Sequence, residues 1–325
     1  MGPWFLLFWY GFIGPGILQR GEVVFQPAAL ESSVPAPFRL EAQTFGYELQ
    51  PVLQTPRYNV SLVRFPSPIT SPDAENNVVH AEFFEPVGFA GKRPAVVVLH
   101  ILGSDFPLSR YMAARLADQG VAALFLKLPY YGERKPRDAG PARRFLSADI
   151  GRTTTSMRQG VCDVRRALSW LQSRGCVDES RLGVAGISLG GIVAALAVAI
   201  DPAAHEGVFL LAGGDLSQIL WNMPEATRFR ESWLAAGRTL EELKSLTDPF
   251  DPLTYAHRLA GKRLLFIAGK IDEVVPPTST LALWKAAGRP PIHWYDCGHY
   301  SAAGYLLPAI RGTVDFLASP VTPSR

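Results

Sequence analysis

Residues 181–200, RLGVAGISLGGIVAALAVAI, decide the fold. The apolar run that ends at Ile187 predicts a buried strand, and the alanine-rich run that follows at once predicts a helix. A single polar side chain, Ser188, stands at this junction within a G-x-S-x-G pattern, between Gly186 and Gly190. So tight a turn strains its central residue, and neighbours without a Cβ atom let the chain approach itself closely. We therefore expect Ser188 to project above the sheet edge at a helix N-terminus, where free N–H groups favour an anion.

Strands and helices alternate on both sides of this junction. Wholly apolar runs such as RPAVVVLH, residues 93–100, are typical of strands that are buried on both faces. Amphipathic helical patterns separate these runs, for example at 108–120, 153–175 and 306–319. The alternation predicts an α/β fold with a mostly parallel sheet that is covered by helices on both faces.

The chain divides into three predicted parts. Residues 1–30 form an apolar N-terminal segment, 31–77 an extension with short strands, and 78–325 the catalytic domain. Residues 215–258 interrupt the alternation and predict a lid-like insertion, with an ordinary crossover helix and loop as the alternative. The apolar residues 1–18 contain Gly and Pro and have no Lys or Arg ahead of them. Three interpretations of them are consistent with this pattern: a signal or anchor with possible membrane association, an apolar strand or flap of the fold, or an incorrect start site. The location is therefore cytoplasmic, exported or membrane-anchored.

Charge and cysteine content exclude several classes of function. The 325 residues include 32 Lys and Arg and 29 Asp and Glu, which are interspersed and give a net charge of +3. The sequence contains no run of basic residues of the kind that indicates nucleic-acid binding. The three cysteines have no metal-binding spacing, so they predict no metal site.

A serine nucleophile needs a base and a residue that orients the base. Asp272 follows the strand pattern of LLFIAGK, and His299 follows the last predicted strand. The order Ser188, Asp272, His299 is the one expected for an α/β-hydrolase triad. Asp215 is the main competitor for the acid, whereas Glu273 is predicted to be solvated or structural. Of the six histidines, His299 alone follows the acid in a loop after the final strand.

Two backbone N–H groups are predicted to bind the oxyanion. One belongs to Leu189, directly after the nucleophile. The other comes from the loop HILG, residues 100–103, where we favour Leu102 over Ile101. Trp221, in the predicted lid, is expected to contact the substrate and to make the pocket apolar.

In combination, VVVLHILG, GISLGG, GKIDEVVPP and CGHY make residues 78–318 resemble the α/β-hydrolase superfamily. The resemblance implies an eight-stranded, mostly parallel sheet and a Ser-His-Asp triad without a metal or an organic cofactor. LPYYGERKP, residues 128–136, resembles a group of abhydrolase-domain lipase-like proteins, and the HILG loop resembles dienelactone-hydrolase-type esterases. The loop departs from the common HG-x-G form, so the resemblance does not choose between Leu102 and Ile101 as the second oxyanion donor.

The PYYGERKP loop follows a strand, so its side chains are expected at the same sheet edge as Ser188. Tyr130, Tyr131 and Arg134 are therefore candidate substrate-binding residues, with a loop held by packed tyrosines and a structural Arg134 as the alternative. The sequence predicts a serine carboxylic-ester hydrolase, of carboxylesterase or lipase-like type, acting on a small-molecule ester. A peptidase or thioesterase of the same fold, or a non-catalytic binding or anchor module, are the alternatives. The oligomeric state stays open.

Overall fold

The computed structural model describes residues 12–13, 16–26, 29–103, 106–137, 145–147 and 149–320. In this part of the chain eleven strands form one sheet: β1 (Phe12–Ile13), β2 (Gln19–Phe25), β3 (Gln43–Gln54), β4 (Tyr58–Pro66), β5 (Val78–Pro86), β6 (Arg93–Leu99), β7 (Ala122–Leu126), β8 (Val177–Ile187), β9 (Glu206–Leu210), β10 (Arg263–Gly269) and β11 (Ile292–Tyr295). The α-helices are α1 (Pro107–Asp118), α2 (Ile150–Gln172), α3 (Leu189–Ile200), α4 (Leu216–Asn222), α5 (Thr227–Ala235), α6 (Leu240–Thr247), α7 (Pro277–Ala286) and α8 (Leu306–Ala318).

The strand order is β1-β3-β4-β5-β7-β6-β8-β9-β10-β11, and β2 also pairs with β3. The six strands from β7 to β11 in this order are parallel to their neighbours, whereas β1 to β5 form antiparallel pairs. A further antiparallel pairing joins β5 to β7. The mostly parallel α/β-hydrolase fold that the sequence predicted is confirmed.

The expected number of eight strands is too low for the described residues. The eight expected strands correspond to β4–β11, and residues 12–54 add β1, β2 and β3. β1 and β2 lie one after the other along the same edge of β3. The 12 residues of β3 also exceed the short strands that we expected in this region. The residues of β2 and β3 are largely exposed or half-exposed and include Gly, Pro and charged residues. They therefore contain no continuous apolar run from which a strand could be predicted.

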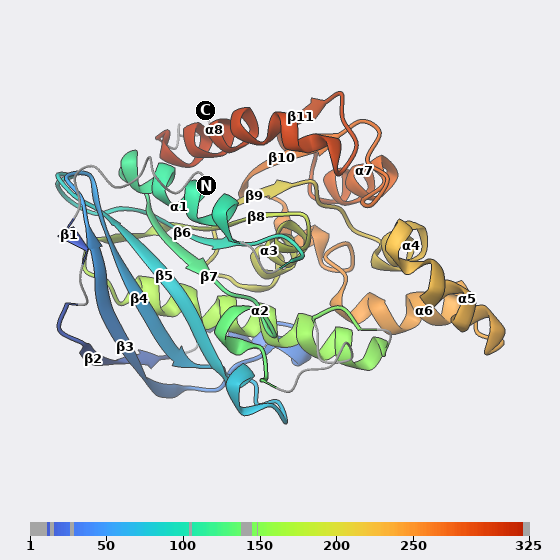
Figure 1. The fold of residues 1–325 in the computed structure, drawn as a ribbon, viewed down its shortest axis with the longest axis horizontal. Helices are drawn as coiled ribbons and strands as arrows, with labels where there is room; N and C mark the ends of the chain where they lie inside the picture. The colour runs from blue at the N-terminus through green and yellow to red at the C-terminus, as the bar shows by residue number, and fades with distance from the viewer. Residues whose placement is uncertain are drawn as a thin grey trace.

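Helices cover both faces of the parallel part of the sheet (Figure 1). α1 and α8 pack on one face, where Met112, Leu116 and Val314 are buried against Val96 and Val98. α2 and α3 pack on the other face, where Trp170 and Val193 are buried against Val97. These two cores explain why β6 and β7 read as nearly continuous apolar runs.

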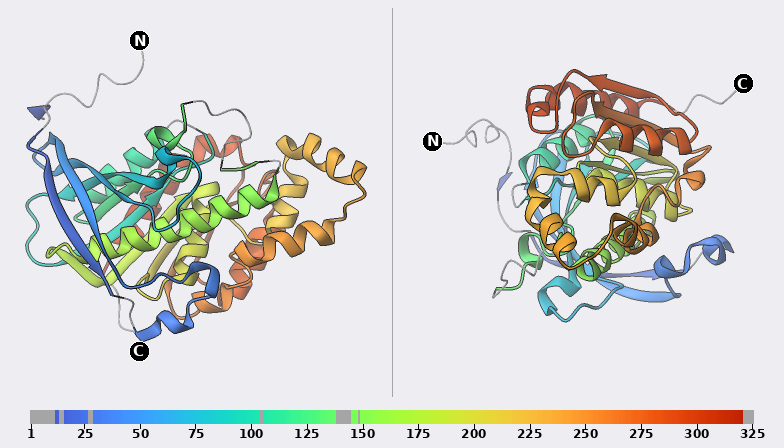
Figure 2. Two further views of the ribbon diagram at one scale, coloured as in Figure 1. Left: turned by 90° about the horizontal axis from the view of Figure 1, so that it is seen from below. Right: turned by 90° about the vertical axis from the view of Figure 1, so that its right-hand side faces the viewer.

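Three short helices interrupt the alternation between β9 and β10, within the predicted insertion. Figure 2 shows α4, α5 and α6 at the end of the molecule opposite β1–β3. This is the end at which the parallel strands terminate and the loops that carry chemistry begin. The predicted anchor, signal or flap of residues 1–18 lies largely outside the described residues.

Candidate active site

Ser188 occupies the turn between β8 and α3 in a strained conformation, with φ 54° and ψ −118°. A Cβ atom on Gly186 would collide with the carbonyl group of Gly190. A Cβ atom on Gly190 would lie 2.6 Å from the carbonyl oxygens of Leu99 and His100. The two glycines therefore allow the elbow to pack against the end of β6, and the strain is held by buried structure on both sides.

Ser188, His299 and Asp272 form a continuous chain of hydrogen bonds. Ser188 Oγ lies 2.8 Å from His299 Nε2, and His299 Nδ1 lies 2.8 Å from Asp272 Oδ2. Because the carboxylate can only accept, the ring proton belongs on Nδ1, and Nε2 is left to accept the serine proton. The three groups thus have the geometry that activates a serine hydroxyl.

The loop after β10 holds the acid in place. Asp272 Oδ1 accepts hydrogen bonds from the backbone N–H groups of Val274 and Val275, at 2.9 and 2.7 Å. The neighbouring Glu273 accepts one from the backbone N–H of His299, at 2.8 Å. Glu273 was expected to be solvated or structural, and the structure gives it this bond to the histidine loop. This hydrogen bond connects the loop that contains Asp272 to the loop that contains His299.

The rival residues lie elsewhere. Asp215 caps the N-terminus of α4, where its carboxylate accepts from the backbone N–H of Gln218 and the hydroxyl of Ser217. His100 is buried beneath the oxyanion loop, and burial lowers its pKa to about 4. His80 lies in β5, where burial lowers its pKa to about 4 as well. The imidazole that Ser188 Oγ contacts is that of His299.

Leu189 and Leu102, the predicted oxyanion donors, both border the space next to Ser188. Leu189 is the first residue of α3, so its N–H has no acceptor within the helix. His100 Nε2 accepts the backbone N–H of Leu128 at 3.0 Å, which places the ring proton on Nδ1, 2.7 Å from the carbonyl oxygen of Ile101. Since C=O and N–H of one trans peptide point in opposite directions, this bond turns the N–H of Leu102 away from the His100 ring.

Two cavities open on either side of Ser188. The smaller one, of about 70 Å³, lies under α4 and α6 and is lined by residues that include Ile192, Ile219 and Leu220. The larger one, of about 390 Å³, is lined by residues that include His299 and Ala303. These linings combine residues from loops and helices that are far apart in the chain, so no local sequence pattern predicts them.

Comparison with known proteins agrees with this geometry. Residues 65–217 match the family described as "Alpha/beta hydrolase domain containing 18", and residues 154–302 match the prolyl oligopeptidase family. The chain belongs to the α/β-hydrolase superfamily. Its structure is similar to acetyl xylan esterase 1 from Thermoanaerobacterium sp. JW/SL YS485, with a TM-score of 0.65 and 20% identity, covering 83% of this chain and 87% of the other.

Other α/β hydrolases and related sequences extend the comparison. The fold resembles an acetyl xylan esterase from Paenibacillus sp. R4, with a TM-score of 0.63 and 20% identity over 87% of this chain and 91% of that one. Over 214 residues the sequence is 28% identical to the uncharacterized protein Rv2627c of Mycobacterium tuberculosis (strain ATCC 25618 / H37Rv). That match covers 64% of this hydrolase but spans only 50% of the relative.

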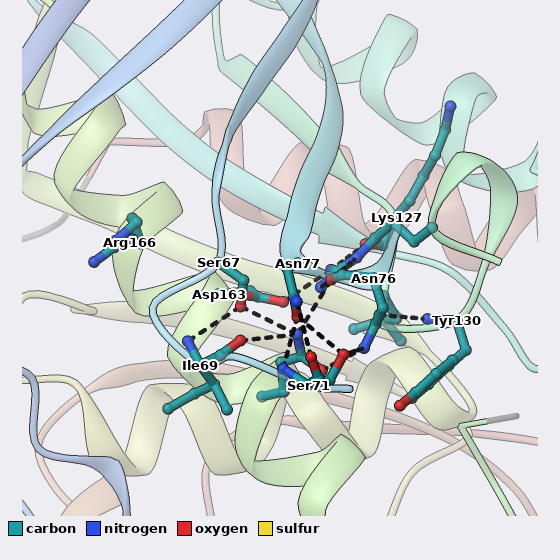
Figure 3. A network of polar contacts seen from close by, with 12 residues as sticks. Ser67, Ile69, Ser71, Asn76, Asn77, Lys127, Tyr130, Asp163 and Arg166 are labelled. Carbon is teal, nitrogen blue, oxygen red and sulfur yellow. Dashed lines mark hydrogen bonds and ion pairs between the residues drawn. The ribbon is translucent and has the colours of Figure 1, made fainter. Parts of the chain in front are cut away.

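The structure places Arg134 away from the expected substrate-facing position. Its side chain is fully buried and forms an ion pair with Asp163, with Nη1 and Oδ2 2.8 Å apart. The guanidinium also donates to the carbonyl oxygens of Asn76 and Lys127. Figure 3 shows the polar network around Asp163 and Asn76, which joins α2 to the loop between β4 and β5 and to the loop that follows β7. Arg134 is thus buried because a carboxylate and two carbonyl groups surround it, as the structural alternative held.

The other three predicted substrate residues also have structural contacts. Tyr130 has φ 67°, and its backbone N–H donates to Asn76 Oδ1 at 3.0 Å (Figure 3). The Tyr131 ring packs on His100, with 4.5 Å between centroids. Trp221 packs in the small cluster around Trp233 under the insertion. The cavity walls at Ser188 are built by other residues, among them Met223 and Val274.

Within the described residues, no group of three or more His, Cys, Asp and Glu side chains is arranged to hold a metal ion. None of the helices in that part of the chain combines the length and the hydrophobicity that a bilayer crossing requires.

Proposed function

We propose that this α/β hydrolase is a serine carboxylic-ester hydrolase that works through an acyl-enzyme. The observation that carries the proposal is the hydrogen-bonded chain from Ser188 through His299 to Asp272 beside two apolar cavities. Ser188 Oγ attacks the ester carbonyl carbon while His299 Nε2 takes the hydroxyl proton. Asp272 stabilises the imidazolium that forms.

The negative charge that develops on the carbonyl oxygen needs donors in place before the reaction. The backbone N–H groups of Leu189 and Leu102 fill that role in the proposal. His299 then gives its proton to the alcohol oxygen as the bond from carbon to that oxygen breaks. Water hydrolyses the acyl-enzyme in the second half by the same proton route, which restores Ser188.

Apolar cavity walls favour an ester over a peptide. Described residues that line both cavities include Leu102, Met223 and Val274, and none of the lining residues is Asp, Glu, Lys or Arg. A peptide would place several backbone N–H and C=O groups against these walls, where unpaired polar groups are costly. The names of the structurally similar acetyl xylan esterases support ester chemistry for this chain.

One comparison favours a second candidate, the cleavage of an amide bond. The prolyl oligopeptidase family matches residues 154–302, which include all three triad residues. The fold is also similar to a puromycin-hydrolyzing peptidase of Mycobacterium tuberculosis, with a TM-score of 0.56 and 17% identity, although the match covers only 46% of that chain. Parallel assays with matched esters and anilides decide between the two candidates.

The test is labelling with a fluorophosphonate probe together with hydrolysis of p-nitrophenyl acetate. We expect stoichiometric labelling of Ser188, and we expect Ser188→Ala to lower ester turnover by at least about 10³-fold. Ser169→Ala is the matched control, because Ser169 is similarly buried but lies on α2 away from the triad. Absence of labelling and of turnover in the folded protein would refute the proposal and favour a non-catalytic module. Full turnover by Ser188→Ala would refute the assignment of Ser188 as the nucleophile.

A further inference from the structure

The two cavities beside Ser188 differ in which part of the catalytic apparatus borders them. Ser188 lines both, and Leu102, Met223 and Val274 separate them. His299 lines only the larger cavity, whereas Leu189 lines only the smaller one. A tetrahedral carbon bonded to Ser188 Oγ would direct its remaining substituents into these two spaces and toward the oxyanion donors.

Proton transfer assigns the two substituents to their cavities. The alcohol oxygen must accept a proton from His299 Nε2, so it has to lie next to that nitrogen, on the side of the larger cavity. The oxyanion takes the direction of the N–H of Leu189. The acyl chain then has one direction left, which is into the smaller cavity above Ile192 of α3.

We infer that the smaller cavity is the acyl site and the larger one the alcohol site. The substrate class is therefore an ester of a short acyl group with a bulky, uncharged alcohol. This inference rests on the proposed ester hydrolysis and specifies its substrate.

The cavity sizes set the length of the acyl group. The smaller space is about 70 Å³. The larger space has more than five times this volume, so the acyl group is expected to be the shorter of the two substituents. Ile219 and Leu220 of α4 form part of the wall of the smaller cavity, so they are expected to limit the length of the acyl chain. The larger space, of about 390 Å³, falls within the range of about 300–1,000 Å³ that is typical of small-molecule sites.

The linings also set the charge of the substrate. The described side chains around the larger cavity are apolar or aromatic apart from Ser188 and His299. A charged group on the alcohol would lose its hydration there without gaining a partner. A neutral alcohol with a large apolar surface loses nothing comparable and gains from burial.

The test is a matrix of kcat/KM values in which acyl length and alcohol size vary independently. One series uses p-nitrophenyl acetate, butanoate, hexanoate and octanoate. The second uses methyl, phenyl and 1-naphthyl acetate. Two variants each alter one cavity: Ile219→Ala enlarges the smaller one, and Ala303→Trp fills the larger one. Ratios of variant to wild type cancel the intrinsic reactivity of each ester.

In the wild-type enzyme, kcat/KM should be highest for acetate or butanoate and fall for longer chains. Ile219→Ala should shift the preference toward hexanoate by up to about fourfold for each methylene that becomes buried. It should leave the order of the acetates with different alcohols unchanged. Ala303→Trp should disfavour 1-naphthyl acetate against methyl acetate by about tenfold and leave the acyl preference unchanged.

Two results overturn the inference and leave ester hydrolysis intact. One is an exchange of the effects, in which Ala303→Trp changes the acyl profile and Ile219→Ala the alcohol profile. The other is a wild-type optimum at octanoate. Failure of the proposed function looks different, because neither series would then be cleaved and the fluorophosphonate would not label Ser188. Melting temperatures show whether each variant is folded.

Discussion

Replacing Arg134 separates a structural role from a role in substrate binding. Both side chains of the Arg134–Asp163 pair are 0% exposed. Asp163 also accepts a hydrogen bond from the hydroxyl of Ser67 at 2.6 Å and interacts with the positive charge of Arg166. Burial raises the pKa of Asp163, and Arg134 opposes this by its positive charge. In Arg134→Met, the buried carboxylate of Asp163 either stays charged without its ion-pair partner or takes up a proton. Both outcomes cost free energy.

We expect Arg134→Met to lower the free energy of unfolding by about 3–5 kcal/mol, the usual effect of breaking a buried pair from one side. Arg134→Lys keeps the charge but loses the planar fork that reaches the carbonyl oxygens of Asn76 and Lys127, so it should be intermediate. Adding Asp163→Leu to Arg134→Met removes the orphaned carboxylate. The double variant should then lose at least about 1 kcal/mol less than the sum of the singles.

Urea unfolding followed by tryptophan fluorescence measures these differences, since Trp170 is fully buried. A kinetic measurement on the folded variants completes the test. If Arg134 faced the substrate, its loss would raise KM for anionic esters more than for neutral esters of equal size. A loss below about 1 kcal/mol, or a selective loss of anionic substrates, would refute the structural role.

Three further outcomes are expected. Asp272→Asn should lower kcat by about 10⁴-fold by favouring the wrong tautomer of His299, whereas Asp215→Ala, which removes a helix cap, should change the urea midpoint more than kcat. The reverse ranking would assign the acid to Asp215. His100→Phe should lower kcat more than it changes KM, because the ring supports the oxyanion loop and does not touch substrate; an equal change in both would contradict this. His80 and His100 are held neutral with pKa values of about 4 against 6.5 for ordinary histidine. The unfolded chain therefore binds more protons between these values, and stability should fall as pH drops through 6.5 toward 4, by about 3 kcal/mol for His100 alone. A flat stability curve over this interval would contradict the burial of both rings.

The parallel half of the sheet and the elbow could be predicted because their signals are local. RPAVVVLH and RLGVAGI are buried on both faces, so their composition alone identifies them as strands. β2 and β3 could not be recognised in the same way. Their residues are partly solvent-exposed. β3 is held in the sheet by its pairing with β4, and β2 by its pairing with β3, rather than by their own hydrophobicity.

The positions of Arg134 and Trp221 depend on contacts with residues that cannot be identified as their partners from the sequence. Charged side chains are seldom fully buried unless they are paired. A guanidinium in a loop beside the expected site is therefore predicted to be accessible and to contact the substrate. Its partner, Asp163, lies in the middle of a helix that reads as amphipathic, and the pairing exists only once α2 is docked. The cavity walls likewise combine α3, α4 and two loops, so their composition follows from the tertiary fold.

Gly190, two residues after the nucleophile, brings the two halves of the proposed oxyanion site together. Gly190 lies so close to Leu99 and His100 that a methyl group would contact their carbonyl oxygens at 2.6 Å. This approach brings α3, which carries the N–H of Leu189, against the end of β6, from which the HILG loop begins. His100 then fixes the Ile101 carbonyl group and so the direction of the next N–H. In HILG, Ile101 stands where the HG-x-G form has a glycine. The loop keeps a fixed conformation, because the His100 ring holds the carbonyl group of Ile101.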